Sequence, residues 1–261
     1  MPFEIVAPNL APFVLVLSLT FFWMVEAWQR LPVQSFAGRK PRNLFVIALD
    51  FVLATTGATL IVLAAQRAAG AGWGLAAFAD LPAAARIAIG VFLIDLVDYW
   101  RHRLSHEIGL LWRLHRLHHS DPEVDVTTSF RNHPVETIMR SLVFASAALL
   151  LGIPAESFVA FSLLWMAVQV FQHARIRLPE ALDRALRLLI VTPRWHRVHH
   201  SQRQVQTDSH YGTLFTIGDR LFGTDMGTIT PEALGLAEFS RPYDRTLRGM
   251  LLNPLLRLPR G

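Results

Sequence analysis

The sequence predicts an all-α integral membrane protein with about four to five membrane helices and a cytoplasmic cap of histidine-rich helices. Three observations lead to this fold class. Hydrophobic residues make up 52% of the chain and charged residues only 17%, a balance outside that of ordinary soluble domains. The hydrophobic residues gather in long runs. All eleven histidines follow position 101, beyond the first three of those runs.

The first three apolar runs are each long enough, at about 1.5 Å per residue, to cross or nearly cross a hydrocarbon core of about 30 Å. They are Leu10–Trp28, Leu44–Ala65 and Leu81–Trp100. We expect the first run to be retained as a membrane helix rather than removed as a signal peptide, because residues 1–9 contain no Lys or Arg.

A helical hairpin is expected after these runs. Its two apolar arms are Ser141–Gly152 and Ala155–Phe171, and the turn signal Gly152-Ile153-Pro154 separates them. Because each arm is shorter than the first three runs, we expect the hairpin to dip into the bilayer or to cross it obliquely. No repeat, low-complexity segment or Gly/Ser linker divides the chain, so residues 1–261 are expected to form a single domain.

Basic residues indicate the orientation of the helices. A formal net charge of +5 would suggest nucleic acid if the chain were soluble. An outside N-terminus with three crossings and a returning hairpin leaves only Arg67 and Arg86 on the outer side, which satisfies the positive-inside rule. We therefore expect no nucleic-acid partner and a cytoplasmic histidine region. The compact length and the lack of an evident endoplasmic-reticulum retrieval signal favour a bacterial inner membrane.

Eight histidines fall into three clusters whose imidazoles share a helical face. The clusters are His102 and His106, then His115, His118 and His119, and finally His196, His199 and His200. One such pair arises easily by chance on a surface helix, but three clusters do not. Neutral imidazole is a good ligand for zinc, copper, iron and nickel, and so many imidazoles packed without metal would repel one another on protonation. The clustering therefore predicts metal binding.

The number of histidines indicates two metal ions. A zinc ion takes four ligands, or three and a water, so eight or more histidines fit two ions with room for oxygen ligands. A zinc protease motif is excluded, because Leu110 stands where a second histidine would have to follow His106 and Glu107. The site also differs from soluble four-helix di-iron proteins, which use Glu and Glu-x-x-His. The chain has no cysteine, which excludes thiolate ligands and nucleophiles.

In these residues the chain resembles the fatty acid hydroxylase and sterol desaturase superfamily of membrane di-iron oxygenases. That family shows H-x3-4-H, then H-x2-H-H, a later single histidine and a second H-x2-H-H. The matching residues are His102, His106, His115, His118, His119, His173, His196, His199 and His200. Similar phrases are Leu111–His115, Thr192–His196 and Tyr211-Gly212 leading to Asp219–Thr224. The resemblance covers roughly residues 90–226, the expected catalytic histidine region, and implies that the nine histidines bind two irons.

The resemblance implies an O2-dependent oxidoreductase that hydroxylates or desaturates a C–H bond of a lipid within the bilayer, such as an acyl chain or a sterol-like lipid. Electrons are expected from a separate cytoplasmic redox protein, because the sequence has neither a dinucleotide fingerprint nor cysteines for an iron–sulfur cluster. One alternative is a histidine-rich membrane protein that binds or transports metal or haem, which predicts histidines inside the crossings. Another is a zinc-dependent membrane hydrolase.

Four further residues are expected to support the metal ligands. Asp98 lies one turn before His102, and we expect its carboxylate to accept a hydrogen bond from a ligand, the alternative being an ion pair with a neighbouring arginine. Gln169 stands where some members of the family have a tenth histidine, so it is expected to coordinate a metal or to hydrogen-bond a metal-bound water. His133 and His210 are expected to form hydrogen bonds near the site rather than to bind metal.

Overall fold

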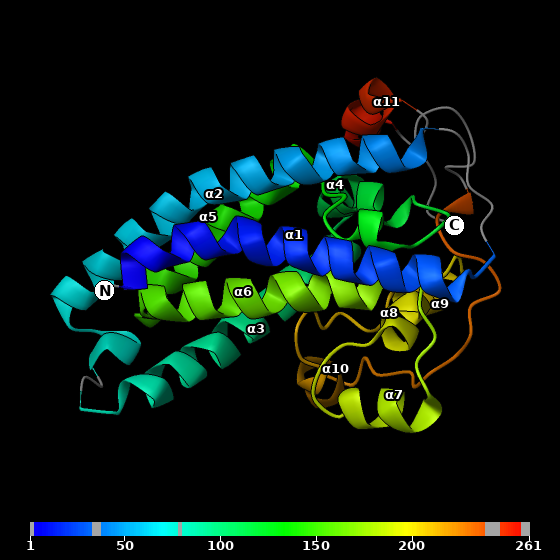
Figure 1. The fold of residues 1–261 in the computed structure, drawn as a ribbon. Coiled ribbons are helices and arrows are strands. Elements are labelled where there is room, and N and C mark those ends of the chain that lie inside the picture. The colour runs from blue at the N-terminus through cyan, green and yellow to red at the C-terminus, as the bar shows by residue number, and fades with distance from the viewer. Residues whose placement is uncertain (1–2, 33–37, 78–79, 238–245, 257–261) are drawn as a thin grey trace.

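Five long helices form a bundle in which they lie lengthwise beside one another (Figure 1). The computed structural model describes residues 3–32, 38–77, 80–237 and 246–256, and it contains no strand within them beyond isolated bridges. The long helices are α1 (Phe3–Gln29), α2 (Arg39–Ala71), α3 (Ala83–Glu107), α5 (Pro134–Leu151) and α6 (Ala155–His173). The prediction of an all-α fold is confirmed.

Short helices gather at one end of this bundle, where α1 ends and α2 begins (Figure 1). They are α4 (Gly109–His119), α7 (Glu180–Leu186), α8 (Pro193–His199), α9 (Gln204–Thr207), α10 (Ile217–Leu221) and α11 (Leu247–Leu252), with the 3-10 turns η2 (Val126–Thr128) and η4 (Asn253–Leu255). We call this group of short elements the cap. A further turn, η1 (Gly74–Ala77), lies at the opposite end of the bundle.

Four helices are long and apolar enough to cross a membrane, and the chain is an integral membrane protein. The candidate spans are Leu10–Gln29, Arg39–Ala71, Pro134–Leu151 and Ala155–His173. Both hairpin arms are longer than their apolar runs, since α5 already begins at Pro134, so each arm can cross rather than merely dip. The expected crossing over Leu81–Trp100 is less apolar than these, because α3 carries Arg86, Asp95 and Asp98. α3 nevertheless packs along α6 as part of the bundle.

At the end of the bundle opposite the cap, the connection between α2 and α3 packs against the connection between α5 and α6. The indole of Trp73 donates a hydrogen bond to the carbonyl of Leu149 over 2.7 Å. Gly74 and Gly152 both have positive φ, and a Cβ on Gly152 would lie 2.2 Å from the carbonyl oxygen of Trp73. This contact joins the α2–α3 connection to the α5–α6 connection. The helix ends that carry the nine histidines lie at the other end of the bundle, at the cap. That the cap faces the cytoplasm stays a prediction.

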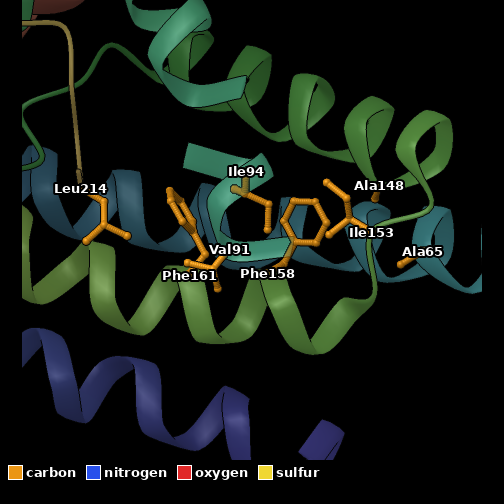
Figure 2. Packing of buried hydrophobic residues seen from close by; sticks show 8 residues of the cluster. All are labelled: Ala65, Val91, Ile94, Ala148, Ile153, Phe158, Phe161 and Leu214. Carbon is orange, nitrogen blue, oxygen red and sulfur yellow. The ribbon is translucent and has the colours of Figure 1, made fainter. Parts of the chain in front are cut away.

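The apolar core lies between α2, α3, α5 and α6 (Figure 2). It contains Ala65, Val91, Ile94, Ala148, Ile153, Phe158, Phe161 and Leu214. Small residues allow the helices to approach closely: a Cβ on Gly90 would lie 2.2 Å from the hydroxyl of Ser157, and one on Gly57 would lie 2.2 Å from that of Ser141. Close packing over small residues is a common way in which helices associate in membranes.

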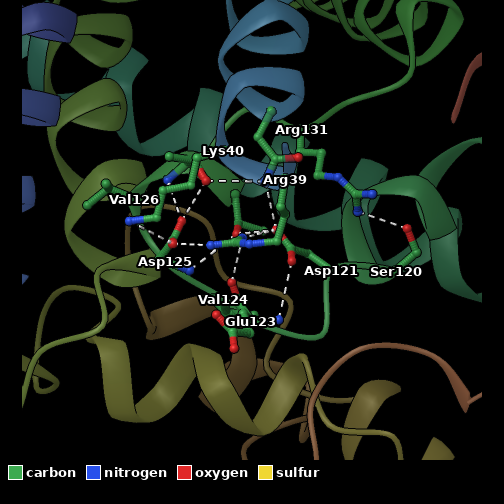
Figure 3. A network of polar contacts seen from close by, with 12 residues as sticks. Arg39, Lys40, Ser120, Asp121, Glu123, Val124, Asp125, Val126 and Arg131 are labelled. Atoms are coloured by element: carbon green, nitrogen blue, oxygen red, sulfur yellow. Dashed lines mark hydrogen bonds and ion pairs between the residues drawn. The ribbon is translucent and has the colours of Figure 1, made fainter. Parts of the chain in front are cut away.

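A buried polar network joins the start of α2 to the loop after α4 (Figure 3). One guanidinium nitrogen of Arg39 lies 2.7 Å from a carboxylate oxygen of Asp121, and another contacts Asp125. Asn43, one turn later, donates to the same oxygen of Asp121 over 2.8 Å. Both carboxylates are almost fully buried. Because the loop follows directly after His119, Arg39 fixes the C-terminal end of a histidine-bearing helix.

Replacing Arg39 by alanine is expected to lower the free energy of unfolding by about 3–5 kcal/mol, because two buried carboxylates lose their principal cation. Lys40→Ala is the matched control: its ammonium is partly exposed and lies 3.7 Å from Asp125, so a loss of about 1 kcal/mol or less is expected. Unfolding in mixed detergent micelles measures both changes. Equal losses in free energy of unfolding would show that the buried ion pairs of Arg39 stabilise the fold no more than the partly exposed contact of Lys40 does.

Candidate metal centre

Nine buried histidines meet where the ends of α3, α4, α6 and α8 converge. The helix α3 continues past its apolar stretch and carries His102 and His106 on its last turns. Those on α4 are His115, His118 and His119. The last residue of α6 is His173, and the third cluster lies on α8 and at its C-cap. All nine side chains are at most 5% exposed.

The nine histidines form two groups. The first comprises His102, His106, His115, His119 and His199, and the second comprises His118, His173, His196 and His200. We call them the five-histidine group and the four-histidine group. Within each, one nitrogen from every ring lies within 4.8 Å of the others. The clusters on α4 and α8 are thus divided between the groups, which touch where the rings of His119 and His200 stack with centroids 4.6 Å apart.

The Nε2 atoms of each group point toward a common centre. In the five-histidine group, the Nε2 of His102 lies 3.0 Å from that of His115 and 3.1 Å from that of His199. In the four-histidine group, the Nε2 of His173 lies 3.1 Å from that of His118 and 3.0 Å from that of His196. With metal–nitrogen bonds of about 2.0–2.1 Å, neighbouring ligands of one ion are about 3 Å apart. The spacing therefore fits imidazoles around a metal ion.

The outer nitrogens of several rings fix the tautomer that metal binding requires. Their Nδ1 atoms donate to backbone carbonyls, from His102 to Tyr211 over 2.8 Å, from His199 to Ser209 over 2.7 Å, and from His173 to Gln169 over 2.8 Å. A carbonyl oxygen only accepts, so these Nδ1 atoms carry the proton and the inward Nε2 atoms present lone pairs. Several lone pairs facing one another in a buried space need a cation, so the residues fit a metal in each group.

Glu136 is hydrogen-bonded to one of the nine histidines, a contact that was not expected from the sequence. Its Oε1 accepts a hydrogen bond from Nδ1 of His115 over 2.7 Å. Arg101 lies 3.5 Å from the same carboxylate and donates to Asp98 over 2.5 Å, and Thr213 donates to Asp98 as well. Asp98 therefore forms the alternative arginine pair and reaches His115 only through Arg101 and Glu136. A carboxylate within the first turn of an apolar helix was the available signal.

His133 lies at the start of α5. Its Nε2 donates to the carbonyl of Leu251 over 3.0 Å, and its Nδ1 accepts from the backbone N–H of Val135 over 3.2 Å. It therefore caps α5 and holds α11 against that helix end. Both ring nitrogens of His133 have backbone partners, so its hydrogen bonds hold helix ends together and do not reach any of the nine histidines.

His210 packs against Trp195, near the start of α8. Its ring stacks on Trp195 with centroids 4.2 Å apart, and its Nδ1 donates to the carbonyl of the same residue over 3.1 Å. The backbone N–H of Met226 donates to its Nε2 over 2.9 Å. Trp195 directly precedes His196, so the hydrogen bond of His210 to Trp195 lies one residue away from one of the nine histidines.

Gln169 lines a small cavity between the two histidine groups. Its side-chain oxygen accepts from Gln172 over 2.5 Å, and its amide shares the lining with His102, His115, His118 and His196. The cavity volume is about 20 Å³, enough for one small molecule such as water. Gln169 thus lies beside histidines of both groups, and its binding of a metal or of a metal-bound water stays a prediction.

Burial favours the neutral form of five histidines of the cap. Desolvation, and secondly the neighbouring imidazoles and cations, hold the pKa well below the ordinary value of 6.5 for all five. These are His118, His119, His196, His199 and His200. Neutral imidazole is the form that binds metal.

Metal-free protein is expected to lose stability as the pH falls below about 6.5. Histidines of the unfolded chain bind protons there, whereas those of the folded chain have lowered pKa values and stay neutral. The free energy of unfolding should fall by up to about 1.4 kcal/mol per pH unit for each such histidine. Thermal unfolding of chelator-treated protein in detergent, from about pH 7.5 to about pH 5.5, measures this. An unchanged Tm would contradict it.

Comparison with known proteins finds one matching family and several similar proteins. The fatty acid hydroxylase family matches residues 87–224. The ornithine lipid hydroxylase OlsE of Rhizobium tropici is 30% identical over 63% of this chain and 52% of its own length. The alkylglycerol monooxygenases of Danio rerio and Homo sapiens are 34% and 31% identical over 50% of this chain and 28% of theirs. The chain thus spans about half the length of the first relative and less of the others.

No solved structure matches the chain. The matched segment begins on α3 and ends after α10, so it includes all nine histidines as well as Glu136. It covers more than half of the sequence. The chain belongs to the fatty acid hydroxylase family.

Proposed function

We propose that the protein is a membrane-bound di-iron oxygenase that hydroxylates, or alternatively desaturates, a C–H bond of a lipid with O2 and external electrons. The observation that carries the proposal is the pair of histidine groups, with five and four imidazoles side by side in one buried site. The relatives named above are a lipid hydroxylase and alkylglycerol monooxygenases, which supports lipid oxidation as the reaction class.

Iron is the metal that this arrangement favours. The five imidazoles of one group exceed the four ligands of a zinc site, and imidazole is a suitable donor for iron. Two bound irons would supply the reduction of O2 and the oxidation of the C–H bond. The chain's own contribution is to hold the imidazoles in one tautomer, to exclude bulk water by burial, and to leave a cavity of about 20 Å³ for a small ligand beside Gln169.

The geometry argues against the haem and transport alternatives. A haem needs its two axial histidines on opposite faces of a flat ring, whereas here neighbouring Nε2 atoms are 3.0–3.3 Å apart and leave no space for one. A conduit needs ligands distributed along the membrane helices. All nine histidines instead gather at the cap end of the bundle.

The electron donor is proposed to be a separate cytoplasmic protein. The sequence has no cysteine with which to bind an iron–sulfur cluster. The cap exposes Arg194, Arg203 and Arg220, each within 4.0 Å of a carboxylate of the chain itself, and an acidic partner would take the place of these carboxylates. We place this cap on the cytoplasmic side of a bacterial inner membrane, in line with the distribution of basic residues.

Lipid analysis of expressing cells tests the function. Cells that produce the protein should contain a lipid species that is heavier by one oxygen atom or lighter by two hydrogen atoms. Cells that produce a His118→Ala/His199→Ala variant, which lacks one imidazole from each group, should not. Identical lipid profiles, together with zinc or haem in the purified protein, would favour the alternatives, a zinc-dependent hydrolase or a protein that binds or transports metal or haem.

A further inference from the structure

We infer that the apolar cleft between α3 and α5 binds a single acyl or alkyl chain of a bilayer lipid, and that the side chains of Arg101, Glu136 and Arg140 separate this hydrocarbon from the histidines. This inference rests on the proposed function, because it names the route by which the substrate of the same site would arrive.

The cleft has the size and lining of a site for a hydrocarbon chain. Its volume is about 520 Å³, within the range of about 300–1,000 Å³ that is usual for ligand pockets. Leu93, Leu96, Val97 and Leu104 of α3 form one wall, and Met139 and Val143 of α5 contribute to the other. The α3 residues follow helical spacing over about 16 Å, at about 1.5 Å per residue, so the cleft is elongated along the helix axis.

The position of the cleft determines the kind of occupant. α5 is a candidate membrane span that packs mainly on α2, whereas its contact with α3 is looser. The rim of the cleft is exposed and apolar, with Trp100 at 40% and Leu104 at 38% exposure. Around a membrane bundle the surrounding medium is lipid, so a lipid chain reaches the cleft sideways without crossing water.

A polar partition connects the cleft to the metal centre. Three residues line both the cleft and the small cavity beside the histidines, namely Arg101, Glu136 and Arg140. Glu136 is hydrogen-bonded to His115, and Arg140 lies 3.3 Å from Asp50 of α2. Arg101 is 3.5 Å from Glu136, the longest of these contacts. Carbons of a chain that lies against this partition are those nearest to the histidines.

Photo-crosslinking tests the cleft without requiring a loaded enzyme. Metal-free and iron-loaded protein would be placed in phosphatidylcholine vesicles that contain a phosphatidylcholine with a diazirine on its acyl chain. After irradiation, labelled residues are mapped by mass spectrometry. Label is expected on Val97, Met139 and Val143 in both forms, and an excess of unlabelled long-chain lipid should reduce it.

Substitutions that fill the cleft should abolish this label. Val97→Trp fills the inner part, and Leu104→Trp narrows the exposed rim, where a larger side chain is accommodated without repacking the core. The matched control is Leu142→Trp, on the neighbouring position of α5, which is 51% exposed and does not line the cleft. The control should keep the label on Met139. Retained label in the folded Val97→Trp and Leu104→Trp variants would overturn the inference.

The two proposals fail in different ways. Loss of lipid oxidation in both cleft variants, with their iron content retained, supports the cleft as the substrate route. If the cleft is labelled but the protein oxidises no lipid, the proposed function is wrong, whereas the inference that the cleft binds a lipid chain still stands. Undiminished lipid oxidation in both cleft variants would overturn the inference that the cleft binds the substrate, but it would not contradict the proposed oxygenase function.

Discussion

Replacing His196 and His200 together by alanine is expected to lower the iron content from about two ions per chain to about one and to abolish lipid oxidation. The two residues are half of the four-histidine group, so only His118 and His173 would remain there. Two imidazoles are too few to hold an ion against a chelator. The five-histidine group keeps all of its ligands, because its α8 member is His199.

The measurement is the metal content of detergent-purified protein from iron-replete cells. The control is His210→Asn, a substitution of a fully buried histidine of the same segment that lies outside both groups. Its positive φ of 53° is tolerated by asparagine, so the fold should persist and both irons should remain. Two irons in the His196→Ala/His200→Ala variant would refute the division into two groups.

Helical periodicity made much of the site predictable. His115, His118 and His119 share one face of α4 at the predicted spacing, as do the histidines of α8. The division of the clusters on α4 and α8 between two groups was not predictable, because it depends on how these two helices face each other. No local pattern indicates that His199 meets His102 while its neighbour His200 meets His173.

Long-range polar contacts also could not be predicted from the sequence. The spacing of Asp98 and His102 predicted a supporting carboxylate on the same helix, but the hydrogen bond to His115 comes from Glu136 on α5. Likewise, no local pattern pairs Arg39 with Asp121, to which it is bound in the buried network. Such pairings follow from the tertiary arrangement, in which α2 packs beside α5 and over the loop after α4.

Glu136→Ala is expected to weaken metal binding by about 10–100-fold, the usual cost of removing a residue that orients a ligating histidine. His115 would lose the acceptor of its Nδ1 proton, and Arg101 would lose one of its two carboxylates. Glu136→Gln should recover part of the loss, because the amide oxygen still accepts a hydrogen bond but carries no charge. Competition with a chelator measures the affinity.

Two further variants separate orientation of the ligand from a general loss of charge. Glu156→Gln removes an exposed carboxylate at the start of the neighbouring helix α6 and should leave the affinity unchanged. Asp98→Asn should cost less than Glu136→Ala, because Asp98 reaches His115 only through Arg101 and Glu136. If Asp98→Asn instead weakened binding more than Glu136→Ala, the carboxylate that matters would be the one on α3, and Glu136 would serve only as the wall of the cleft.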